Sequence, residues 1–448
     1  MQTPIYDFAK KYAESKTVRF HMPGHKGVRF HGLEEYDLTE IRGADYLFEA
    51  EGIIAESEAQ TAKLFGAAKT LYSAEGSSLC IKTMLAIAEH CRPDRSRRML
   101  VAAPRNVHKA FINACILLDI DVCWVYPKEE SRSLCSGGVT PDDIREAITS
   151  ADRTPNCVYI TSPDYLGTMS DVKGISEVCH KSGIPLIVDN AHGAYLKFLP
   201  EDMHPMTLGA DMCCDSAHKT LPCYTGAALL HISKFAPAAF SGCAKKLMSL
   251  FASTSPSYLI MESIDLCSAY LSGEYKAELE KTVLRTSLCK QRLEAMGWKF
   301  FGEELCKLTI AAGECGITGD ELGDRLRSFG IEPEYTDPDY LVLMVTPFNP
   351  EEDFLRLEDA MSHISPKQGA PIKFDTVPRA VVRLPIRQAA FADCEEVPVD
   401  KAKGRVCGMT VTCCQPSVPI AVSGEEITAD IIKLLKRYGI DTISVLIP

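Results

Sequence analysis

The segment CDSAHKTLPC, residues 214–223, places a lysine where its amine could take part in chemistry. Lys219 follows a serine and a histidine, stands shortly before a proline, and comes just after the small and apolar run ADMCCDS. At the end of a buried strand, a lysine amine can bond covalently to the carbonyl group of an aldehyde cofactor. An ordinary surface cation is the other interpretation, and Lys219 by itself does not decide between them.

A carboxylate stands thirty positions before this lysine. Asp189 ends the apolar run PLIVD, where it would meet a ligand crevice at the sheet edge. Such a carboxylate can keep a pyridine nitrogen protonated, which makes the ring an electron sink. Asp189 could instead cap a helix or form a turn. An aspartate and then a lysine, each at a strand end, resembles the arrangement in fold-type I pyridoxal phosphate enzymes.

Groups that could hold a phosphate lie near both positions. The stretch SAEGSSLCIKTMLAIAEH, residues 73–90, has Ser77 and Ser78 directly before a helical pattern. Backbone amides at a helix N-terminus attract anions, so these serines could bind a phosphate or only cap the helix. Ser216 and His218, beside the lysine, could supply further donors to the phosphate.

A histidine follows another expected strand at the same edge. His108, in APRNVHKAF, is placed where it could stack on a flat ring. A structural hydrogen bond is the alternative role for this side chain.

Alternating strand and helix patterns would position these residues. Between residues 60 and 235, short apolar runs bounded by turn residues predict four buried strands, at residues 98–103, 121–126, 157–162 and 185–190. The helical patterns NVHKAFINACILLD and GISEVCHKSG lie between them. This alternation predicts an α/β fold with a mostly parallel sheet and helices on both faces. Ligands on such sheets bind beyond the carboxyl ends of the strands.

The pattern changes in the second half of the chain. Residues 256–297 are expected to form one long helical region, LVLMVTP predicts a strand, and SPKQGAPIKFDTVP indicates a linker. We expect smaller α+β domains at the C-terminal end. The predicted divisions are an N-terminal arm at 1–58, a cofactor-binding large domain at 59–290, a small α+β domain at 291–365 and a C-terminal domain at 366–448.

Composition excludes several classes of function. The formal charge of −12 argues against nucleic acid as a partner and suits a cationic small molecule. No apolar run is long enough to span a membrane, and the N-terminus lacks an apolar signal core. The 19 cysteines, with vicinal pairs at Cys213-Cys214 and Cys413-Cys414, show no zinc spacing, so we expect no metal site. Free thiols and a cytoplasmic location are expected.

A set of motifs resembles the Orn/Lys/Arg decarboxylase family of pyridoxal phosphate enzymes. They occur in the family's order and are, along the chain, FHMPGHKG, DLTEIRGAD, RNVHKA, TSPDYLGTMSDV, VDNAHGA, DSAHKTLP and STSPSYLIMESID. The tail segments LPIRQAAFADCEEVPVDKAKGRV and VPIAVSGEEIT resemble the family's C-terminal domain. The chain is similar to the short form, without the receiver-like domain of the long inducible enzymes.

The resemblance implies a fold and a role for each matching residue. The fold would be the aspartate aminotransferase-like fold type I, with pyridoxal 5'-phosphate as cofactor. Lys219 would be the covalent anchor, Asp189 the partner of the pyridine nitrogen and His108 the stacking ring. The remaining cofactor-binding residues would be His192, Thr161, Ser77, Ser78, Ser216 and His218.

The chain departs from the family near the expected substrate mouth. Phe48 stands where the family usually has a histidine, CYTGA follows HKTLP where threonine and glutamine are frequent, and CCQPSVPIAVSGE replaces a proline-rich version. The distal cation of a dibasic amino acid needs a carboxylate in its pocket. The N-terminal acidic segment could supply it, or could be a solvated loop; its candidate carboxylates are Glu40, Asp45, Glu49 and Glu51. Phe48 would then pack against the aliphatic stem of the substrate.

Decarboxylation of arginine, lysine or ornithine, as in polyamine biosynthesis, is the leading hypothesis for function. A related aminotransferase or lyase is the alternative, with Arg383 or Arg387 as the arginine that would hold a substrate carboxylate. A non-catalytic protein that binds pyridoxal phosphate is a third hypothesis. We further expect a homodimer whose active sites are shared between subunits, because the segments FHMPGHKG and DLTEIRGADYLFEAEG precede the cofactor domain and could reach across.

Overall fold

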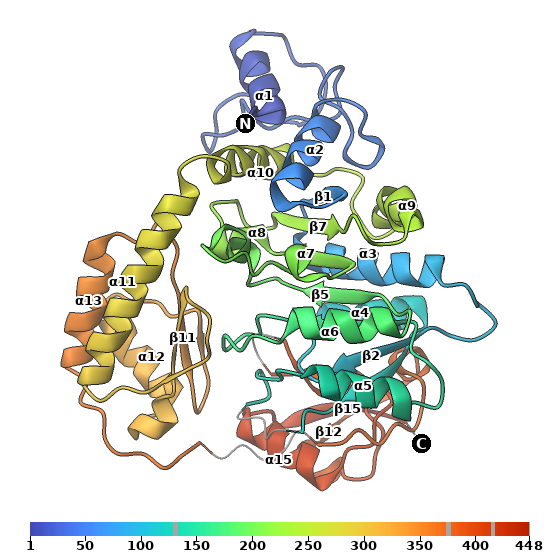
Figure 1. The fold of residues 1–448 in the computed structure, drawn as a ribbon, viewed down its shortest axis with the longest axis vertical. Helices are drawn as coiled ribbons and strands as arrows, with labels where there is room; N and C mark the ends of the chain where they lie inside the picture. Colours follow the sequence, from blue (N-terminus) through green and yellow to red (C-terminus); the bar gives the residue numbers. More distant parts are fainter. Residues whose placement is uncertain (129–132, 373–377, 414–416, 448) are drawn as a thin grey trace. The chain divides into compact units, whose positions relative to one another are not determined.

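The chain folds into two compact units, each assembled from two separate stretches of sequence. The computed structural model describes residues 1–128, 133–372, 378–413 and 417–447. Unit 1 comprises Met1–Pro93 and Pro185–Ala277, and unit 2 comprises Asp94–Ile184 and Glu278–Pro448. Figure 1 shows the two stretches of unit 1 in blue and in green to yellow.

Four strands of unit 1 are hydrogen-bonded in the order β1, β7, β6, β5. Their bounds are Lys69–Ser73 (β1), Ala228–Ile232 (β7), Met212–Asp215 (β6) and Leu186–Asp189 (β5). Strands β5 and β6 are parallel, and Asp189 is in register with Cys214. Strand β7 is antiparallel to both of its neighbours. The expected strands at 185–190 and within ADMCCDS are therefore confirmed.

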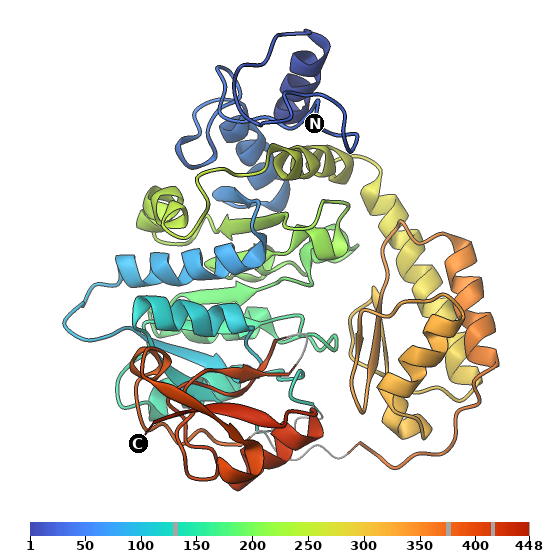
Figure 2. The same cartoon turned by 180° about the vertical axis from the view of Figure 1, so that it is seen from behind.

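Helices of unit 1 lie against these strands and above them (Figures 1 and 2). The longer ones are α1 (Pro4–Glu14), α2 (Ile53–Phe65), α3 (Gly76–Cys91), α9 (Ala238–Ser249) and α10 (Tyr258–Leu271). The short ones are η1 (Leu47–Glu49), η2 (Ala194–Phe198), α7 (Pro205–Leu208) and α8 (Ala217–Thr220). Gly66 ends α2 in the left-handed conformation, with φ of 74°, which glycine adopts without strain.

A buried carboxylate anchors the N-terminal helix to α10. One oxygen of Asp265 accepts hydrogen bonds from the amides of Ile5 and Tyr6 at 2.9 and 3.2 Å. The other oxygen accepts from the Ser57 hydroxyl at 2.5 Å. Asp265 thus satisfies the first amides of α1 and connects α1, α2 and α10.

Unit 2 contains a second set of parallel strands, in the order β4, β2, β3. Their bounds are Cys157–Thr161 (β4), Leu100–Pro104 (β2) and Asp121–Val125 (β3). The accompanying helices are α4 (Lys109–Leu118), α5 (Pro141–Ser150) and α6 (Val172–Lys181). Thr140 and Asp143 form a capping box that begins α5. The predicted α/β fold, with mostly parallel strands and flanking helices, is confirmed.

The rest of unit 2 holds two smaller groups of elements. One is a sheet in the order β10, β11, β9, β8 with nearby helices; its members are β8 (Phe300–Phe301), β9 (Lys307–Ile310), β10 (Tyr335–Thr336), β11 (Leu341–Met344), α11 (Tyr275–Ala295), η3 (Ala312–Cys315), α12 (Gly319–Ser328) and α13 (Glu351–Ser362). Its apolar core runs from Cys289 to Ile364. The other holds two antiparallel strand pairs, β12 with β15 and β13 with β14. Its elements are α14 (Ile386–Ala390), β12 (Cys394–Pro398), η4 (Val399–Lys401), β13 (Val411–Thr412), β14 (Pro419–Ala421), α15 (Ala429–Arg437) and β15 (Thr442–Leu446).

The second half of the chain differs in one respect from the sequence-based prediction, in its long helical region. The helical region at 256–297 is interrupted, because α10 ends at Leu271 and α11 begins at Tyr275. Gly273 lies in this break, and glycine is a poor helix former. The expected linker at 365–378 shows no helix or strand in its described part, and its residues 373–377 lie outside the described residues.

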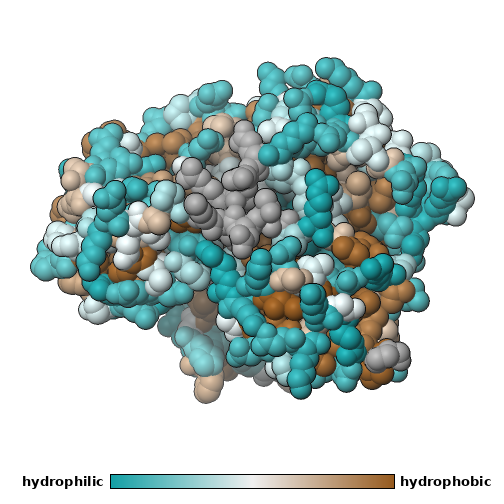
Figure 3. Space-filling model, turned by 90° about the horizontal axis from the view of Figure 1, so that it is seen from below, coloured by the Kyte–Doolittle hydropathy of each residue, from teal (hydrophilic) through white to brown (hydrophobic). Residues whose placement is uncertain are grey.

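The surface of the protein and the state of its cysteines agree with what the amino-acid composition indicates. Polar residues cover most of the face shown in Figure 3, with apolar patches scattered among them. Within the described ranges, no helix is both long and apolar enough to cross a membrane. Every described cysteine is a free thiol, and Cys414 lies outside the described part of the chain.

A second acidic side chain of α10 is buried without a hydrogen-bond partner for one oxygen. Glu262 is 4% exposed, and its Oε1 atom has no partner within the described structure. Burial, followed by the negative charges of Asp37 and Asp265, raises its pKa from 4.5 to about 9. The folded chain therefore holds a proton on Glu262 at neutral pH, whereas the unfolded chain has released it.

This difference predicts a pH-dependent cost to stability. Because the folded pKa lies above the unfolded one, the free energy of unfolding should fall as pH rises from about 4.5 to about 9. Glu262→Gln should remove this dependence, so that its advantage in stability over the wild type grows by on the order of 4 kcal/mol between pH 5 and pH 8. Urea unfolding at both pH values measures the effect, with the exposed Glu280→Gln as control. Equal pH dependence in wild type and Glu262→Gln would contradict the prediction.

Candidate active site

The lysine that the sequence singles out lies beside a histidine. Lys219 belongs to α8, a single helical turn that begins two residues after β6. Its Nζ atom is 3.0 Å from Nε2 of His192, which is buried in the loop after β5. Parallel strands end at the same edge of a sheet, so the loops after β5 and β6 bring the two groups together. An amine and an imidazole at this distance can pass a proton between them.

The aspartate on the neighbouring strand is almost completely buried. Asp189 ends β5 and is 2% exposed. Its Oδ1 atom accepts hydrogen bonds from the Ala191 amide at 3.2 Å and from the Cys214 thiol at 3.6 Å. The contact with Ala191 shows that Asp189 also supports the turn after β5. A buried carboxylate is stabilised by a paired cation, and a protonated ring nitrogen could be that cation at this strand end.

Two serine hydroxyls meet at the N-terminus of α3. Ser216, directly after β6, donates a hydrogen bond to the Ser77 hydroxyl at 2.7 Å. Gly76 has φ of +70°, and a Cβ built there would find no atom within 4 Å, so the space beside the helix start is open. Ser78 follows in the first turn of the 16-residue helix. Open space, hydroxyl donors and a helix N-terminus fit a phosphate group.

His218 has a structural contact in the same region. Its Nδ1 atom is 2.8 Å from the carbonyl oxygen of Ala227, and its backbone amide donates to the same oxygen at 3.2 Å. These bonds connect α8 to the residue preceding β7. A further contact between His218 and a phosphate stays a prediction.

The remaining cofactor candidates, His108 and Thr161, belong to unit 2. His108 caps α4, and its Nδ1 atom accepts from the Ala110 amide at 3.1 Å. The hydroxyl of Thr161, the last residue of β4, is buried and has no hydrogen-bond partner among the residues that the structure describes. Both follow or end parallel strands, where the sequence predicts them to be. Their contact with a cofactor stays a prediction.

The acidic N-terminal segment has a defined structure. Asp45 accepts hydrogen bonds from the amides of Tyr46, Glu51, Gly52 and Ile54 at 2.8–3.1 Å. Burial opposes its ionisation, but these amides lower the pKa of Asp45. Asp45 therefore organises the loop that leads into α2, and a substrate contact would come in addition. Glu40 is exposed and accepts a bond from Thr39.

A cavity of about 580 Å³ lies beside this segment in unit 1. Phe48, Glu49 and Glu51 are among its lining residues. Glu58 and Lys245, which also line it, form an ion pair at 2.8 Å. Glu49 and Glu51 are exposed carboxylates at the cavity, whereas Phe48 is buried.

The two arginines considered for substrate carboxylate binding are already engaged. Arg387 donates to the carbonyl oxygens of Ile116 and Leu117, both at 2.9 Å. Arg383 pairs with Glu426 at 2.5 Å. Arg387 thus satisfies carbonyl groups at the end of α4.

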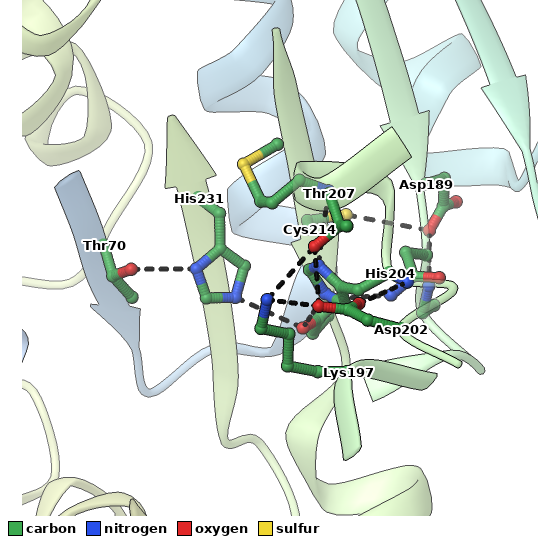
Figure 4. Close-up of polar contacts among 12 residues, drawn as sticks. Thr70, Asp189, Lys197, Asp202, His204, Thr207, Cys214 and His231 are labelled. Carbon is green, nitrogen blue, oxygen red and sulfur yellow. Dashed lines mark hydrogen bonds and ion pairs between the residues drawn. The ribbon is translucent and has the colours of Figure 1, made fainter. Parts of the chain in front are cut away.

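Sequence reasoning missed a buried cluster next to the lysine loop. Asp215 Oδ2 is 3.0 Å from Nε2 of His204 and 3.2 Å from Nε2 of His231. Figure 4 shows His204 and His231 among the polar contacts of this region. The two histidines are far apart in the sequence, in MHPMT and LLHIS, and neither belongs to a recognisable motif. Only Asp215, a carboxylate at the end of the apolar run MCCD, could have been noticed from the sequence.

Comparison with known proteins identifies the family. The sequence model described as Orn/Lys/Arg decarboxylase, major domain, matches residues 3–305. The chain belongs to the Orn/Lys/Arg decarboxylase family. Arginine decarboxylase of Bacillus subtilis (strain 168) is 28% identical over 461 residues, covering 96% of this chain and 92% of that protein. Arginine decarboxylase of Bacillus anthracis is 26% identical and covers 97% of this chain and 93% of its own length.

Solved structures of this decarboxylase family share the fold. The lysine decarboxylase LdcF of Francisella novicida matches with a TM-score of 0.82 at 17% identity, covering 99% of this chain and 81% of that chain. The constitutive lysine decarboxylase of Escherichia coli matches with a TM-score of 0.80 at 18% identity, covering 100% of this chain and 82% of that chain. The fold assignment thus holds along the whole chain.

The serine pair gives a test for phosphate binding. We expect Ser77→Ala and Ser216→Ala each to weaken binding of pyridoxal 5'-phosphate by roughly tenfold, because each removes a hydroxyl donor to a charged group. Binding of pyridoxal, which lacks the phosphate, should change little. Titration of the cofactor-free protein with both ligands measures the difference, with the exposed Ser272→Ala as control. Equal losses for both ligands would show that the hydroxyls act on the fold and not on the phosphate.

Proposed function

We propose that this protein catalyses the pyridoxal phosphate-dependent decarboxylation of a basic amino acid, with arginine as the first candidate. The observation that carries the proposal is Lys219 Nζ at 3.0 Å from His192, in the unit that also holds buried Asp189. Family membership supports the reaction class. Arginine comes first because two relatives matched over more than nine-tenths of their length, from Bacillus subtilis (strain 168) and Bacillus anthracis, are named arginine decarboxylases.

The donor set fits the proposed cofactor. Pyridoxal phosphate supplies a carbonyl that bonds to amines and a ring that accepts the electron pair released at the α carbon. Lys219 would hold it covalently, and Asp189 would keep a proton on its ring nitrogen. Ser77, Ser78 and Ser216 would bind its phosphate. Asn190 and Thr220 add buried polar atoms without partners in the described structure, Oδ1 and Oγ1 respectively, to this region.

Lys219 and His192 would manage the proton. The amine of Lys219 has to lose a proton before it bonds to a carbonyl, and His192 is placed to accept it. After carbon dioxide has left, the amine of Lys219 or a group on the His108 side would deliver a proton to the α carbon. Buried Asp189 would pair with the protonated ring nitrogen, so that the ring can accept the electron pair left when carbon dioxide departs.

The cavity beside the N-terminal segment lies at the start of β1, level with Met212 and at the sheet edge opposite Asp215, so this segment would supply specificity for a dibasic substrate to the active site of a partner subunit. Glu49 and Glu51 are carboxylates at this cavity, and either could pair with a guanidinium or ammonium group. Phe48 would pack against the aliphatic stem of the substrate. The engagement of Arg383 and Arg387 in other contacts favours decarboxylation over transamination, since neither is poised for a substrate carboxylate.

A homodimer is part of the proposal. The segment 18–33 exposes apolar side chains that a monomer would leave in water; Phe20 is 95% exposed, Phe30 84% and Val18 76%. Met22, Val28 and Leu33 are exposed in the same segment. Such a concentration of apolar groups is typical of protein interfaces. A second copy of the chain would cover it and bring the segment to the partner's active site.

The reaction is tested with each dibasic amino acid. Purified protein with pyridoxal phosphate should release carbon dioxide and the matching amine from at least one of arginine, lysine and ornithine. Lys219→Ala should lose the visible absorbance of the covalently held cofactor and reduce the rate by at least ~10³-fold, because both the anchor and a proton donor are removed. Amination of a 2-oxo acid without release of any amine product would favour the aminotransferase alternative.

The assembly is tested by sedimentation. The protein should sediment as a dimer at assay concentration, and Phe20→Ser with Phe30→Ser should shift it towards monomer and reduce activity. Phe235→Ser removes an aromatic ring of similar exposure, 88%, outside the segment and serves as control. A monomer with full activity would overturn the proposed assembly.

A further inference from the structure

Asp215 is a completely buried carboxylate that accepts hydrogen bonds from three side chains. His204 and His231 approach its Oδ2 atom at 3.0 and 3.2 Å. The Nδ2 atom of Asn190 donates to its Oδ1 atom at 2.6 Å. Asp215, His204 and His231 are each 0% exposed. All four residues belong to unit 1.

The proton positions on both histidines follow from their other contacts. The backbone amide of Met206 donates to Nδ1 of His204 at 3.3 Å, so that nitrogen is an acceptor and the ring proton lies on Nε2. On His231, Nδ1 is 2.8 Å from the hydroxyl of Thr70, and Figure 4 shows this contact as a dashed line. Burial lowers the pKa of His231, which favours its neutral form. Both Nε2 atoms then donate to Asp215.

This pattern is that of a hydrogen-bonded network and not of a metal centre. A metal ion would need a lone pair on Nε2 of His204, but that atom carries the proton that Nδ1 cannot hold. The carboxylate stays ionised: burial opposes the charge, but the two histidines hold the pKa of Asp215 well below its usual range. An ionised carboxylate is the group that accepts from all three donors at once.

The network joins the two strand ends from which the reactive residues emerge. Asn190 directly follows Asp189, and its amide donates to the carbonyl of Cys214 at 3.0 Å. Asp215 directly precedes Ser216 and the turn that carries Lys219. The bond from Asn190 to Asp215 therefore fixes the end of β5 against the end of β6. His204 and His231 hold the carboxylate from the opposite side.

We propose that Asp215 is a positioning residue that sets Asp189 and Lys219 in the arrangement needed to bind pyridoxal phosphate. This inference rests on the proposed function. Asp215 would act on Asp189 and Lys219 through Asn190 and the backbone. Asparagine at position 215 would keep the shape but remove the negative charge to which Asn190, His204 and His231 donate.

The test compares Asp215 with Asp211, two buried aspartates at opposite ends of β6. Asp215→Asn should weaken the affinity for pyridoxal phosphate at least ~tenfold, since the charge-assisted hydrogen bonds that the carboxylate accepts become neutral ones. In the cofactor-free protein, the amides of residues 216–222 should exchange hydrogen faster than in wild type. Asp211→Asn is the control, because Asp211 accepts from the Leu186 amide at 2.8 Å beside the start of β6 and β5. It should leave both measurements close to wild type.

A residue exchange separates positioning from general stability. In the double variant Asn190→Asp with Asp215→Asn, the carboxylate and the amide change places, and every bond of the network can form again. It should recover affinity to within about threefold of wild type. If Asp215→Asn does not fold, the double variant is compared with wild type directly, and a tenfold weaker affinity in a folded double variant would overturn the proposal.

Three further results would overturn either the positioning role of Asp215 or the proposed function. Equal affinity in Asp215→Asn and Asp211→Asn, with unchanged exchange at 216–222, would overturn the positioning role. One equivalent of zinc in the purified protein, lost in Asp215→Asn, would also overturn it and show a metal site. Failure of the wild type to bind pyridoxal phosphate would refute the proposed function, while the exchange measurement on the cofactor-free protein would still report whether Asp215 holds the lysine turn.

Discussion

The parallel pairing of β5 with β6 determines where the reactive groups of this protein stand. Its register sets Asp189 beside Cys214, so the residues that follow each strand leave the sheet at one level. A lysine amine, an imidazole, a carboxylate and the hydroxyl of Ser216 all come from these two strand ends. A shift of one residue would turn Asp189 to the other face of the sheet and separate it from the others. Only short loops are then needed to complete the site.

Local patterns were sufficient to predict the elements that carry this site. The runs DVCWVY, CVYITS and PLIVDN are short, apolar and bounded by turn residues, and each forms the strand expected of it. Lys219 and Asp189 could be singled out because a charged residue at the end of a buried strand needs a reason to be there. Single residues could not identify the family; the order in which the motifs occur along the chain could.

Other features depend on contacts between distant segments, which local patterns do not contain. His204 and His231 meet Asp215 only because β7 pairs antiparallel with β6 and because a four-residue helix begins at Pro205. The oxygens of Asp45 accept hydrogen bonds from backbone amides up to ten residues along the chain, a structural role in addition to the predicted contact with a substrate cation. Hydrogen bonds of this kind depend on loop conformation, which composition does not specify. The break between α10 and α11 likewise needed the structure to locate it.

The antiparallel pairing of β1 with β7 has a consequence for synthesis on the ribosome. Lys69 pairs with Ile232, and roughly 150 residues separate the end of one strand from the start of the other. At the ~5–20 residues per second of translation, β1 would wait roughly 8–30 s for its partner after leaving the ribosome. During that interval a buried strand, with Leu71 and Tyr72 at 0% exposure in the finished protein, has an open edge. Nascent chains of this protein therefore present a natural substrate to chaperones that bind extended apolar segments.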